Sequence, residues 1–314
     1  MSRVIDFLSR RRAAAASPTT GAAPAGDVAG LVQGFSIEVM PRTAAKIDRF
    51  ADLLPLGTRV YIAHIDGTPI EDMAATARRI AAEGFEVMPH VPARSVPSKA
   101  ALADWIARYQ GEAGVRSALL LGGGVAEPRG PFHCSMQLME TGLFDRAGFD
   151  RLHVAGHPEG NSDIDPDGSE KNVMAALRWK RDFAERTDAR MAIATQFVFD
   201  AAPVVAWAGR LREAGVDLPV HVGVAGPAKL QTLIKYALAC GIGPSVRVLQ
   251  KRAADLTRLA LPFAPDEVLA DLAAARAADP SLPVAQVHFF PLGGIEKTAD
   301  YACGTSAAGA ARYA

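Results

Sequence analysis

Polar residues stand near the ends of several short apolar segments of this sequence, and their types suit proton transfer and the binding of a polar ligand. In chain order they are Glu38, His64, His90, Gly122–Gly124, His157, Glu159, Gln196, His221 and His288. Polar groups at the ends of buried strands cost free energy unless they are hydrogen-bonded or used. One such residue says little, but several that converge on one rim form a candidate site.

The spacing of these residues excludes several familiar sites. Gly122–Gly124 follow an apolar run, but VAEPRGP comes next and no G-x-G-x-x-G pattern is completed, so a Rossmann dinucleotide turn is not expected. The three glycines are compatible with a close approach of the backbone to a ligand and with a simple turn. The seven histidines lack H-E-x-x-H and H-x-H spacing, and no G-x-S-x-G elbow is present. We therefore expect neither a metal centre nor acyl transfer.

The D-x-D-x-D-G pattern at 163–168 is similar to the opening of a calcium-binding loop. The twelfth position of such a loop needs a bidentate carboxylate but is Met174 here, and Pro166 interrupts the loop. We therefore expect no calcium site. These acids are instead expected to cap the helix that follows, with Asp167 or Ser169 near its N-terminus.

Eight apolar segments predict the β-strands that position these residues. They are GFSIEVM (34–40), TRVYIAH (58–64), FEVMPHV (85–91), RSALLL (116–121), RLHVAG (151–156), RMAIATQF (190–197), PVHVGV (219–224) and AQVHFF (285–290). Most of the intervening segments have helical periodicity, as at 72–84, 99–110 and 169–187, and the interval 225–284 has room for two or three helices.

This alternation of strands and helices has the size and rhythm of a (β/α)8 TIM barrel, an α/β fold. A doubly wound open sheet shows the same alternation and is the competing fold. We predict the barrel, in which chemistry lies at the C-terminal ends of the strands.

The N-terminal residues differ in composition from the rest. Residues 1–30 combine a short basic segment with a stretch rich in Ala, Pro, Gly, Ser and Thr, which has few large apolar side chains to offset the entropy of ordering. Asp6 departs from a transit-peptide pattern, and the apolar core of a secretory signal is missing. We expect an extension over 1–30, flexible or packed on the surface, followed by a single barrel domain over 31–314.

Composition excludes several classes of protein. The 314 residues carry 34 Lys and Arg against 34 Asp and Glu, so there is no excess positive charge to favour nucleic acid or an anionic membrane. No run approaches 18 apolar residues, so a transmembrane helix is not expected. Cys134, Cys240 and Cys303 lie far apart, which excludes a disulfide scaffold or zinc ribbon and fits a cytoplasmic protein. A homo-oligomer is compatible with the sequence, which does not show the oligomeric state.

Several strand ends, taken together, resemble the methylenetetrahydrofolate reductase family of flavin-dependent (β/α)8 barrels. SIEVMP (36–41) resembles the family's F-E-F-F-P-P, and MPHV (88–91) resembles its A-P-H-L, while LLLGGG (119–124) stands where the family has L-R-G-D. VAGHPEGN (154–161) resembles V-A-x-Y-P-E-x-H, and LRWK (177–180) resembles L-K-x-K. ATQFVFD (194–200) resembles I-T-Q-F-F-F-D, and VHFFPL (287–292) resembles the closing F-H-F-Y-T-L. The matches occur in the family's order over about residues 34–304.

The resemblance implies roles for individual residues. Glu38 matches the family's acid, which protonates the folate as its methylene bridge opens to an iminium ion. We expect a partly apolar site to raise the pKa of this carboxyl, so that it can supply a proton near neutral pH. Gln196 matches the pterin-binding glutamine, whose carboxamide can both donate and accept hydrogen bonds, and Phe197 and Phe290 are expected beside the folate.

The resemblance also implies an FAD site. The positions that touch FAD in the family correspond to His90, Gly122, Gly123, His157, Asn161 and Lys180, of which Lys180 suits a phosphate or ribose contact. The family's Arg and Asp beside the flavin are replaced by Leu121 and Gly123, and its closing Y-T-L-N-R by a strand end that continues Pro-Leu-Gly-Gly. These departures weaken the usual flavin electrostatics and nicotinamide docking more than the folate chemistry.

The implied activity is the interconversion of 5,10-methylenetetrahydrofolate and 5-methyltetrahydrofolate in one-carbon metabolism, with FAD as cofactor and NAD(P)H as an electron donor left open. An alternative is that the enzyme oxidises 5-methyltetrahydrofolate in a demethylation pathway with another electron partner. A second alternative is a folate- or flavin-binding barrel without turnover.

Overall fold

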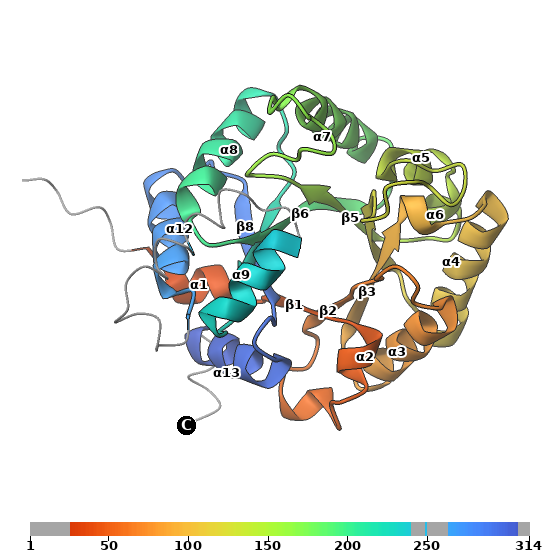
Figure 1. Ribbon diagram of the computed structural model, residues 1–314, viewed down its shortest axis with the longest axis horizontal. Coiled ribbons are helices and arrows are strands. Elements are labelled where there is room, and N and C mark those ends of the chain that lie inside the picture. Colours follow the sequence, from red (N-terminus) through yellow and green to blue (C-terminus); the bar gives the residue numbers. More distant parts are fainter. Residues whose placement is uncertain (1–25, 240–248, 250–262, 307–314) are drawn as a thin grey trace, which may run out of the picture.

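Eight parallel strands close into a barrel in which each strand pairs with its neighbours in the chain (Figure 1). The computed structural model describes residues 26–239, 249 and 263–306. The strands are β1 (Ser36–Val39), β2 (Arg59–Ile62), β3 (Glu86–Pro92), β4 (Ser117–Leu121), β5 (Arg151–Gly156), β6 (Arg190–Val198), β7 (Val220–Ala225) and β8 (Val284–Phe290). All eight predicted strands are confirmed.

The pairing of β1 with β8 distinguishes the barrel from the competing open sheet. Ser36 is in register with His288, and Ile37 with Phe289, so the first and last strands join and no sheet edge remains. Side chains alternate between the two faces of a strand, so Ile37 packs outward under the helices while Ser36 faces the barrel interior. The predicted (β/α)8 fold is therefore confirmed.

Helices surround the barrel and connect its strands (Figure 1). Their bounds are α1 (Val28–Val32), α2 (Pro41–Ala44), α3 (Ile70–Ala82), α4 (Lys99–Ala113), α5 (Ser135–Glu140), α6 (Leu143–Arg146), α7 (Lys171–Ala184), α8 (Ala201–Glu213), α9 (Leu230–Ala239), α12 (Asp266–Ala278) and α13 (Ile295–Thr305), with short 3-10 turns at Phe50–Asp52 and Ala93–Ser95. The helices predicted at 72–84, 99–110 and 169–187 correspond to α3, α4 and α7, and the interval 225–284 contains α9 and α12.

The helix α1 begins shortly before the boundary expected at residue 31. Its Leu31 and Val32 are buried in the main hydrophobic core, and it packs against α12, α13 and β8. The packed structure therefore includes at least the last residues of the predicted extension, while residues 1–25 lie outside the described part of the chain. Among the described residues, no helix combines the length and apolarity needed to cross a membrane.

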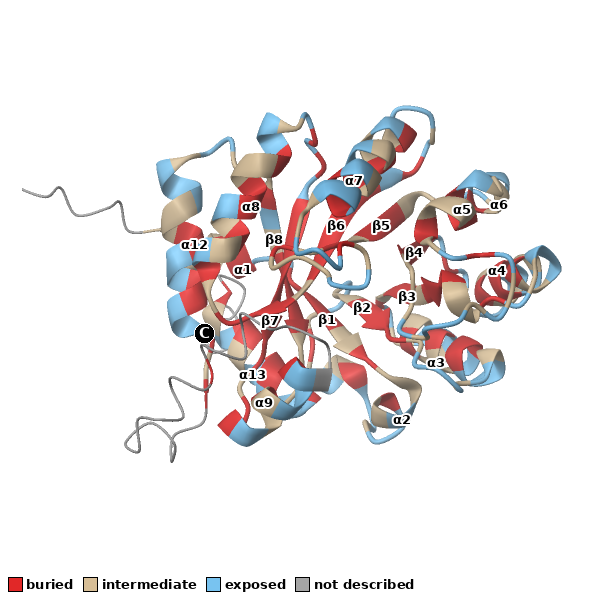
Figure 2. Ribbon diagram, turned by 45° about the horizontal axis from the view of Figure 1, so that its top comes forward, coloured by how far each residue is buried: buried red, intermediate tan, exposed pale blue. Residues whose placement is uncertain are grey.

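Apolar side chains concentrate between the strands and the surrounding helices. Figure 2 shows that buried positions lie along the strands and that the helices carry both buried and exposed positions. The barrel interior is different, because its apolar cluster contains only a few residues: Tyr61, Met88, Leu119 and Ala194, with Leu121 beside them. Much of the remaining interior is polar, as the buried Ser36, His153, His221 and His288 show. A barrel interior is usually filled by branched apolar side chains, so this polar interior requires its own explanation.

Gly223 allows β6 and β7 to approach closely where their register shifts between Ala194 and Phe197. A Cβ atom at Gly223 would lie 2.6 Å from the carbonyl oxygens of Thr195 and Gln196. We expect Gly223→Ala to lower the free energy of unfolding by about 1–3 kcal/mol, because the backbone must move. Gly209→Ala in α8 is the matched control, since nothing lies within 4 Å of its new Cβ. The control is expected to raise stability by about 0.5–1 kcal/mol.

Urea unfolding of both variants measures this difference. Equal midpoints for Gly223→Ala and Gly209→Ala would contradict the close approach of the two strands.

Candidate active site

A cavity of about 1340 Å³ opens at the C-terminal ends of the strands, and most of the predicted site residues line it. The lining includes Glu38, His64, His90, Gly122, Gly123, Gly124, His157, Glu159, Asn161, Gln196, Phe197, His288 and Phe290. These residues come from β1, β3, β6 and β8 and from the loops that follow β2, β4 and β5. The barrel therefore brings together the strand-end residues that the sequence presents as separate.

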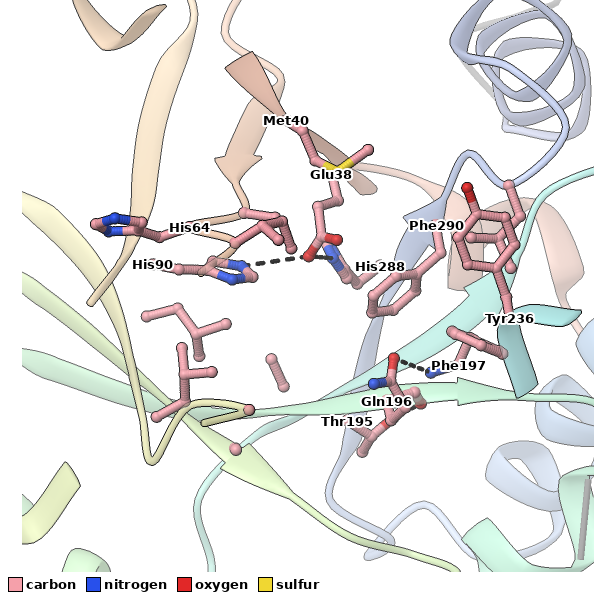
Figure 3. A pocket seen from close by; sticks show the side chains of 18 of the residues that line it. Glu38, Met40, His64, His90, Thr195, Gln196, Phe197, Tyr236, His288 and Phe290 are labelled. Carbon is pink, nitrogen blue, oxygen red and sulfur yellow. Dashed lines mark hydrogen bonds and ion pairs between the residues drawn. The ribbon is translucent and has the colours of Figure 1, made fainter. Parts of the chain in front are cut away.

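Glu38 lies between two histidines at the floor of this cavity (Figure 3). Its Oε2 is 3.2 Å from His90 Nε2 and 3.8 Å from His288 Nε2. His288 is fixed in turn by Ser36, whose Oγ is 2.9 Å from His288 Nδ1. The parallel register of β1 and β8 places Ser36 opposite His288 and so determines this contact.

The ionisation of Glu38 differs from the sequence-based expectation. Burial by itself would raise the pKa of Glu38, but the charge of His90 and the contacts with His288 and His90 outweigh burial and lower the pKa to about 2. The prediction of a raised pKa is therefore wrong, because it considered the apolar surroundings and not the two imidazoles. Glu38 is a carboxylate at neutral pH, and it can accept a proton or stabilise a nearby cation.

Gln196 and a group of aromatic rings lie together on one side of the cavity, away from His64 and His90 (Figure 3). The Gln196 Oε1 accepts a hydrogen bond from the Phe197 backbone N–H at 3.2 Å, and within the described residues the amide NH2 makes no hydrogen bond. The rings of Phe197 and Phe290 lie 5.3 Å apart in an edge-to-face arrangement. A flat ligand with polar edges and an apolar face fits this side.

The glycine loop after β4 forms part of the opposite side. Gly123 has a φ of +97°, a conformation that side chains rarely adopt. Cβ atoms at Gly122 and Gly124 would meet nothing closer than 4.0 Å, so bare backbone faces the cavity there. Arg94 braces the loop, since its backbone N–H donates to Gly122 O and its guanidinium to Val125 O. The loop therefore makes a turn, and it also exposes backbone that a ligand could approach closely.

His157 and Asn161 lie next to this loop on the segment after β5. Asn161 Oδ1 accepts from the N–H groups of Asp163 and Ile164 and so holds the turn. Burial, with a contribution from the charge of Lys180, lowers the pKa of His157 to about 4, so its imidazole is neutral near pH 7. A neutral imidazole and a carboxamide can both donate and accept hydrogen bonds to a polar ligand.

Lys180 does not line the cavity, in contrast to the other residues predicted to contact a cofactor. It lies on the buried face of α7 with its Nζ 3.4 Å from the Ala155 carbonyl oxygen. Burial lowers the pKa of Lys180 to about 8. The predicted phosphate or ribose contact is not supported by this position, because the side chain is enclosed between the helix and β5.

The acids at 163–168 act as a helix cap, as expected. Asp165 is buried, and its two oxygens accept from the N–H groups of Asn172 and Val173 in the first turn of α7. Asp167 accepts from the Ser169 N–H nearby. No group of three or more His, Cys, Asp or Glu side chains in the described part of the chain is arranged to hold a metal ion.

The prediction that His221 lies at a strand end is wrong. His221 is the second residue of β7 and points into the barrel interior beside His153, where the ring centroids are 4.7 Å apart. Sequence reasoning also missed Ser36, Tyr61 and His153, which lie in the same interior. Their signal was the alternation along each strand, because Ser36 and Glu38 occupy successive inward positions of β1.

No known family model matches the chain. Solved structures with a similar course of the chain include a β-mannanase from Thermomonospora fusca, at 12% identity and a TM-score of 0.37 over 65% of this chain and 74% of the mannanase. They also include the carboxyl transferase domain of Rhizobium etli pyruvate carboxylase, determined with 3-bromopyruvate and with pyruvate. Both of these have 12% identity and a TM-score of 0.41, and they cover 82% and 84% of this chain. The chain spans about two fifths of those carboxylase chains (39% and 41%). At this similarity the likeness carries no argument about activity.

Proposed function

We propose that this barrel is an enzyme, a flavin-dependent oxidoreductase that interconverts 5,10-methylenetetrahydrofolate and 5-methyltetrahydrofolate. The main support is the position of the Glu38 carboxylate, between the side formed by His90 and the glycine loop and the side formed by Gln196 and Phe290. These two sides carry the residues that resemble, respectively, the flavin and folate sites of the methylenetetrahydrofolate reductase family.

The cavity fits FAD in size and in the chemistry of one side. Its volume exceeds the roughly 300–1,000 Å³ typical of a site for one drug-sized ligand, which leaves room for a flavin and a folate together. His90, the exposed backbone of Gly122–Gly124, His157 and Asn161 would hold the cofactor. Arg94, which also lines this side, offers a cation close to the position where the family's Arg is replaced by Leu121. FAD would supply the acceptor or donor of a hydride.

Gln196 and the aromatic rings would hold the folate so that its reacting carbon faces the flavin side. The carboxamide can hydrogen-bond the edge of a pterin, and Phe197 and Phe290 can pack against its apolar surface. Glu38, at the junction of the two sides, would then lie near the folate nitrogens that exchange a proton.

Glu38, with His90 and His288 beside it, would exchange that proton and stabilise the positive charge that develops on the folate. Bridge opening breaks the bond between the methylene carbon and N10, places a proton on N10 and leaves an iminium cation at N5. The Glu38 carboxylate can stabilise this cation in either direction of the reaction. To act as an acid, Glu38 must first receive a proton, and His90 and His288 are the groups in contact with it.

The ionised state of Glu38 is also compatible with an alternative, in which the enzyme oxidises 5-methyltetrahydrofolate. In that direction the methyl group loses a hydride, N10 closes on the iminium carbon, and the N10 proton passes to a base. A carboxylate whose pKa is lowered by His90 and His288 against the effect of burial is ionised and ready for that role.

Flavin binding and folate reactivity can be tested together. Purified protein incubated with FAD is expected to become yellow and to melt at a higher temperature, since ligand at about 100 times its dissociation constant stabilises by about 2.7 kcal/mol. Anaerobic addition of 5-methyltetrahydrofolate is expected to bleach the flavin. Protein that stays colourless and melts unchanged would argue against a flavoprotein, and yellow protein that does not bleach would indicate a binding barrel without turnover.

Gln196→Ala is expected to weaken folate binding by about 1–3 kcal/mol, because a pterin hydrogen bond is lost. FAD affinity should stay the same. Asn161→Ala is the reciprocal variant, and it should weaken FAD while leaving folate unchanged. Isothermal titration of both variants with each ligand measures this. The reverse pattern would show that the two sides of the cavity are wrongly assigned.

Glu38→Gln keeps the shape of the side chain but removes its charge and its proton. Since the carboxylate would serve both directions, we expect each flavin half-reaction with folate to slow by about 10²–10⁴-fold. Anaerobic stopped flow on each direction provides the measurement, with Glu296→Gln at the exposed rim of the cavity as the matched control. Rates near wild type in both directions would leave Glu38 as a structural carboxylate.

A further inference from the structure

The strand β6 has one residue more than its neighbour β7 at the edge of the cavity. The register of the two strands shifts between Ala194 and Phe197, so that Thr195 and Gln196 together oppose the single residue Val222. Such an insertion is a β-bulge, which bends its strand and can redirect a side chain, and bulges are over-represented next to active sites. This bulge contains the glutamine that is proposed to bind the pterin.

The other edge of β6 is regular. Its pairing with β5 runs without a shift from Arg151 opposite Arg190 to Gly156 opposite Thr195. The bulge is therefore local to the ladder between β6 and β7, and a group that spans this ladder is placed to hold it.

The bulge reverses the alternation of side chains along β6. Ile193 and Val198 both pack in the main hydrophobic core, although residues five positions apart face opposite sides of a regular strand. On the inner side, Ala194 belongs to the apolar cluster of the barrel interior. The successive residues Gln196 and Phe197 both line the cavity, which two neighbours in a regular strand could not do with their side chains (Figure 3).

The hydroxyl of Thr195 spans the bulge with two hydrogen bonds. Thr195 Oγ1 accepts from the Gly223 N–H at 2.8 Å and donates to the Gln196 carbonyl oxygen at 2.8 Å. Thr195 is 2% exposed and Gly223 is buried, so bulk water does not reach this bond in place of the hydroxyl. A buried N–H that loses its acceptor costs free energy, so the hydroxyl stabilises the bulged form of the strand.

The direction of the Gln196 carboxamide follows from the same bulge. Its Oε1 accepts from the Phe197 N–H, the bond drawn beside Gln196 in Figure 3. Because a backbone N–H must meet an acceptor, the carboxamide oxygen turns back to its own strand. The NH2 group makes no hydrogen bond within the described residues, and its two donors are available to a ligand.

We propose that Thr195 is a positioning residue, whose hydroxyl holds the β6 bulge and thereby presents the Gln196 NH2 to the ligand. Both functions of the hydroxyl, donor and acceptor, are used within the protein, so Thr195 acts through Gln196. The ligand group that fits is a hydrogen-bond acceptor on the edge of a flat ring, such as the carbonyl oxygen or a ring nitrogen of a pterin. The identity of the ligand rests on the proposed function, whereas the bulge and its hydrogen bonds do not.

The role of the hydroxyl is tested first without folate, by NMR of the full-length protein. Thr195→Val keeps the shape of the side chain but removes both hydrogen bonds. We therefore expect the Gly223 amide to exchange with solvent faster by about 5-fold or more, and the Gln196 NH2 resonances to shift. Thr195→Ser keeps a hydroxyl and is expected to behave like the wild type.

Thr58→Val is the matched control for these measurements. The Thr58 hydroxyl also donates to a backbone carbonyl, that of Pro55, but it lies just before β2 at the opposite end of the barrel. Gly223 and Gln196 signals that are the same in Thr195→Val as in the wild type would overturn the positioning role. Thr195→Ala, which also lacks the hydroxyl, gives the same test if Thr195→Val does not fold.

The effect on the ligand is tested by anaerobic titration of the FAD-loaded protein with tetrahydrofolate, which has no methyl group to give up a hydride. Thr195→Val is expected to raise the dissociation constant of tetrahydrofolate by about 10-fold, with FAD affinity unchanged and with Thr195→Ser and Thr58→Val close to the wild type. Added to Gln196→Ala, Thr195→Val should cause no further loss, because the hydroxyl acts through the carboxamide.

Two results separate the positioning role from the proposed function. Losses that add in the double variant would overturn the positioning role and leave Thr195 as a structural residue. Wild-type protein that binds no tetrahydrofolate would contradict the proposed function, and the NMR comparison of Thr195→Val with Thr195→Ser would then decide by itself whether Thr195 positions Gln196.

Discussion

The contact of one buried carboxylate with two imidazoles determines most of what this barrel can do. Glu38 can remain ionised beneath the cavity only because His90 and His288 offset the cost of burying its charge. That requirement places polar residues on β1, β3 and β8 in an interior that apolar side chains fill in most barrels of this kind. The charge of Glu38 suits reactions in which a cation develops or a proton is exchanged nearby.

The strands could be predicted because each is a short apolar run bounded by turn residues, and the barrel because eight such runs alternate with amphipathic helices. The convergence of Glu38, His90 and Gln196 on one cavity also followed, since parallel strands in a barrel present their C-terminal ends on one face. These inferences needed only local pattern and fold topology.

Properties that depend on register were not predictable in the same way. The ionisation of Glu38 depends on His288, which lies at the other end of the chain and is placed by the pairing of β1 with β8. Two other errors had visible signals. Lys180 shares the spacing of the buried Val173 and Leu177 on α7, which predicts burial. His221 lies in the first half of its own predicted strand and so could not be at its end.

The neutral histidines of the interior also determine how the protein responds to acid. The unfolded chain binds protons at histidines near pH 6.5, whereas burial keeps the folded-state pKa of His157 at about 4 and that of His221 at about 3. Above pH 6.5 these two histidines are neutral in both the folded and the unfolded state and cost no stability. Below pH 6.5, each of them lowers the free energy of unfolding by about 1.4 kcal/mol per pH unit until the pH reaches its folded-state pKa. Glu38 stays ionised throughout this range. We therefore expect acid to destabilise the barrel before the Glu38 carboxylate becomes protonated.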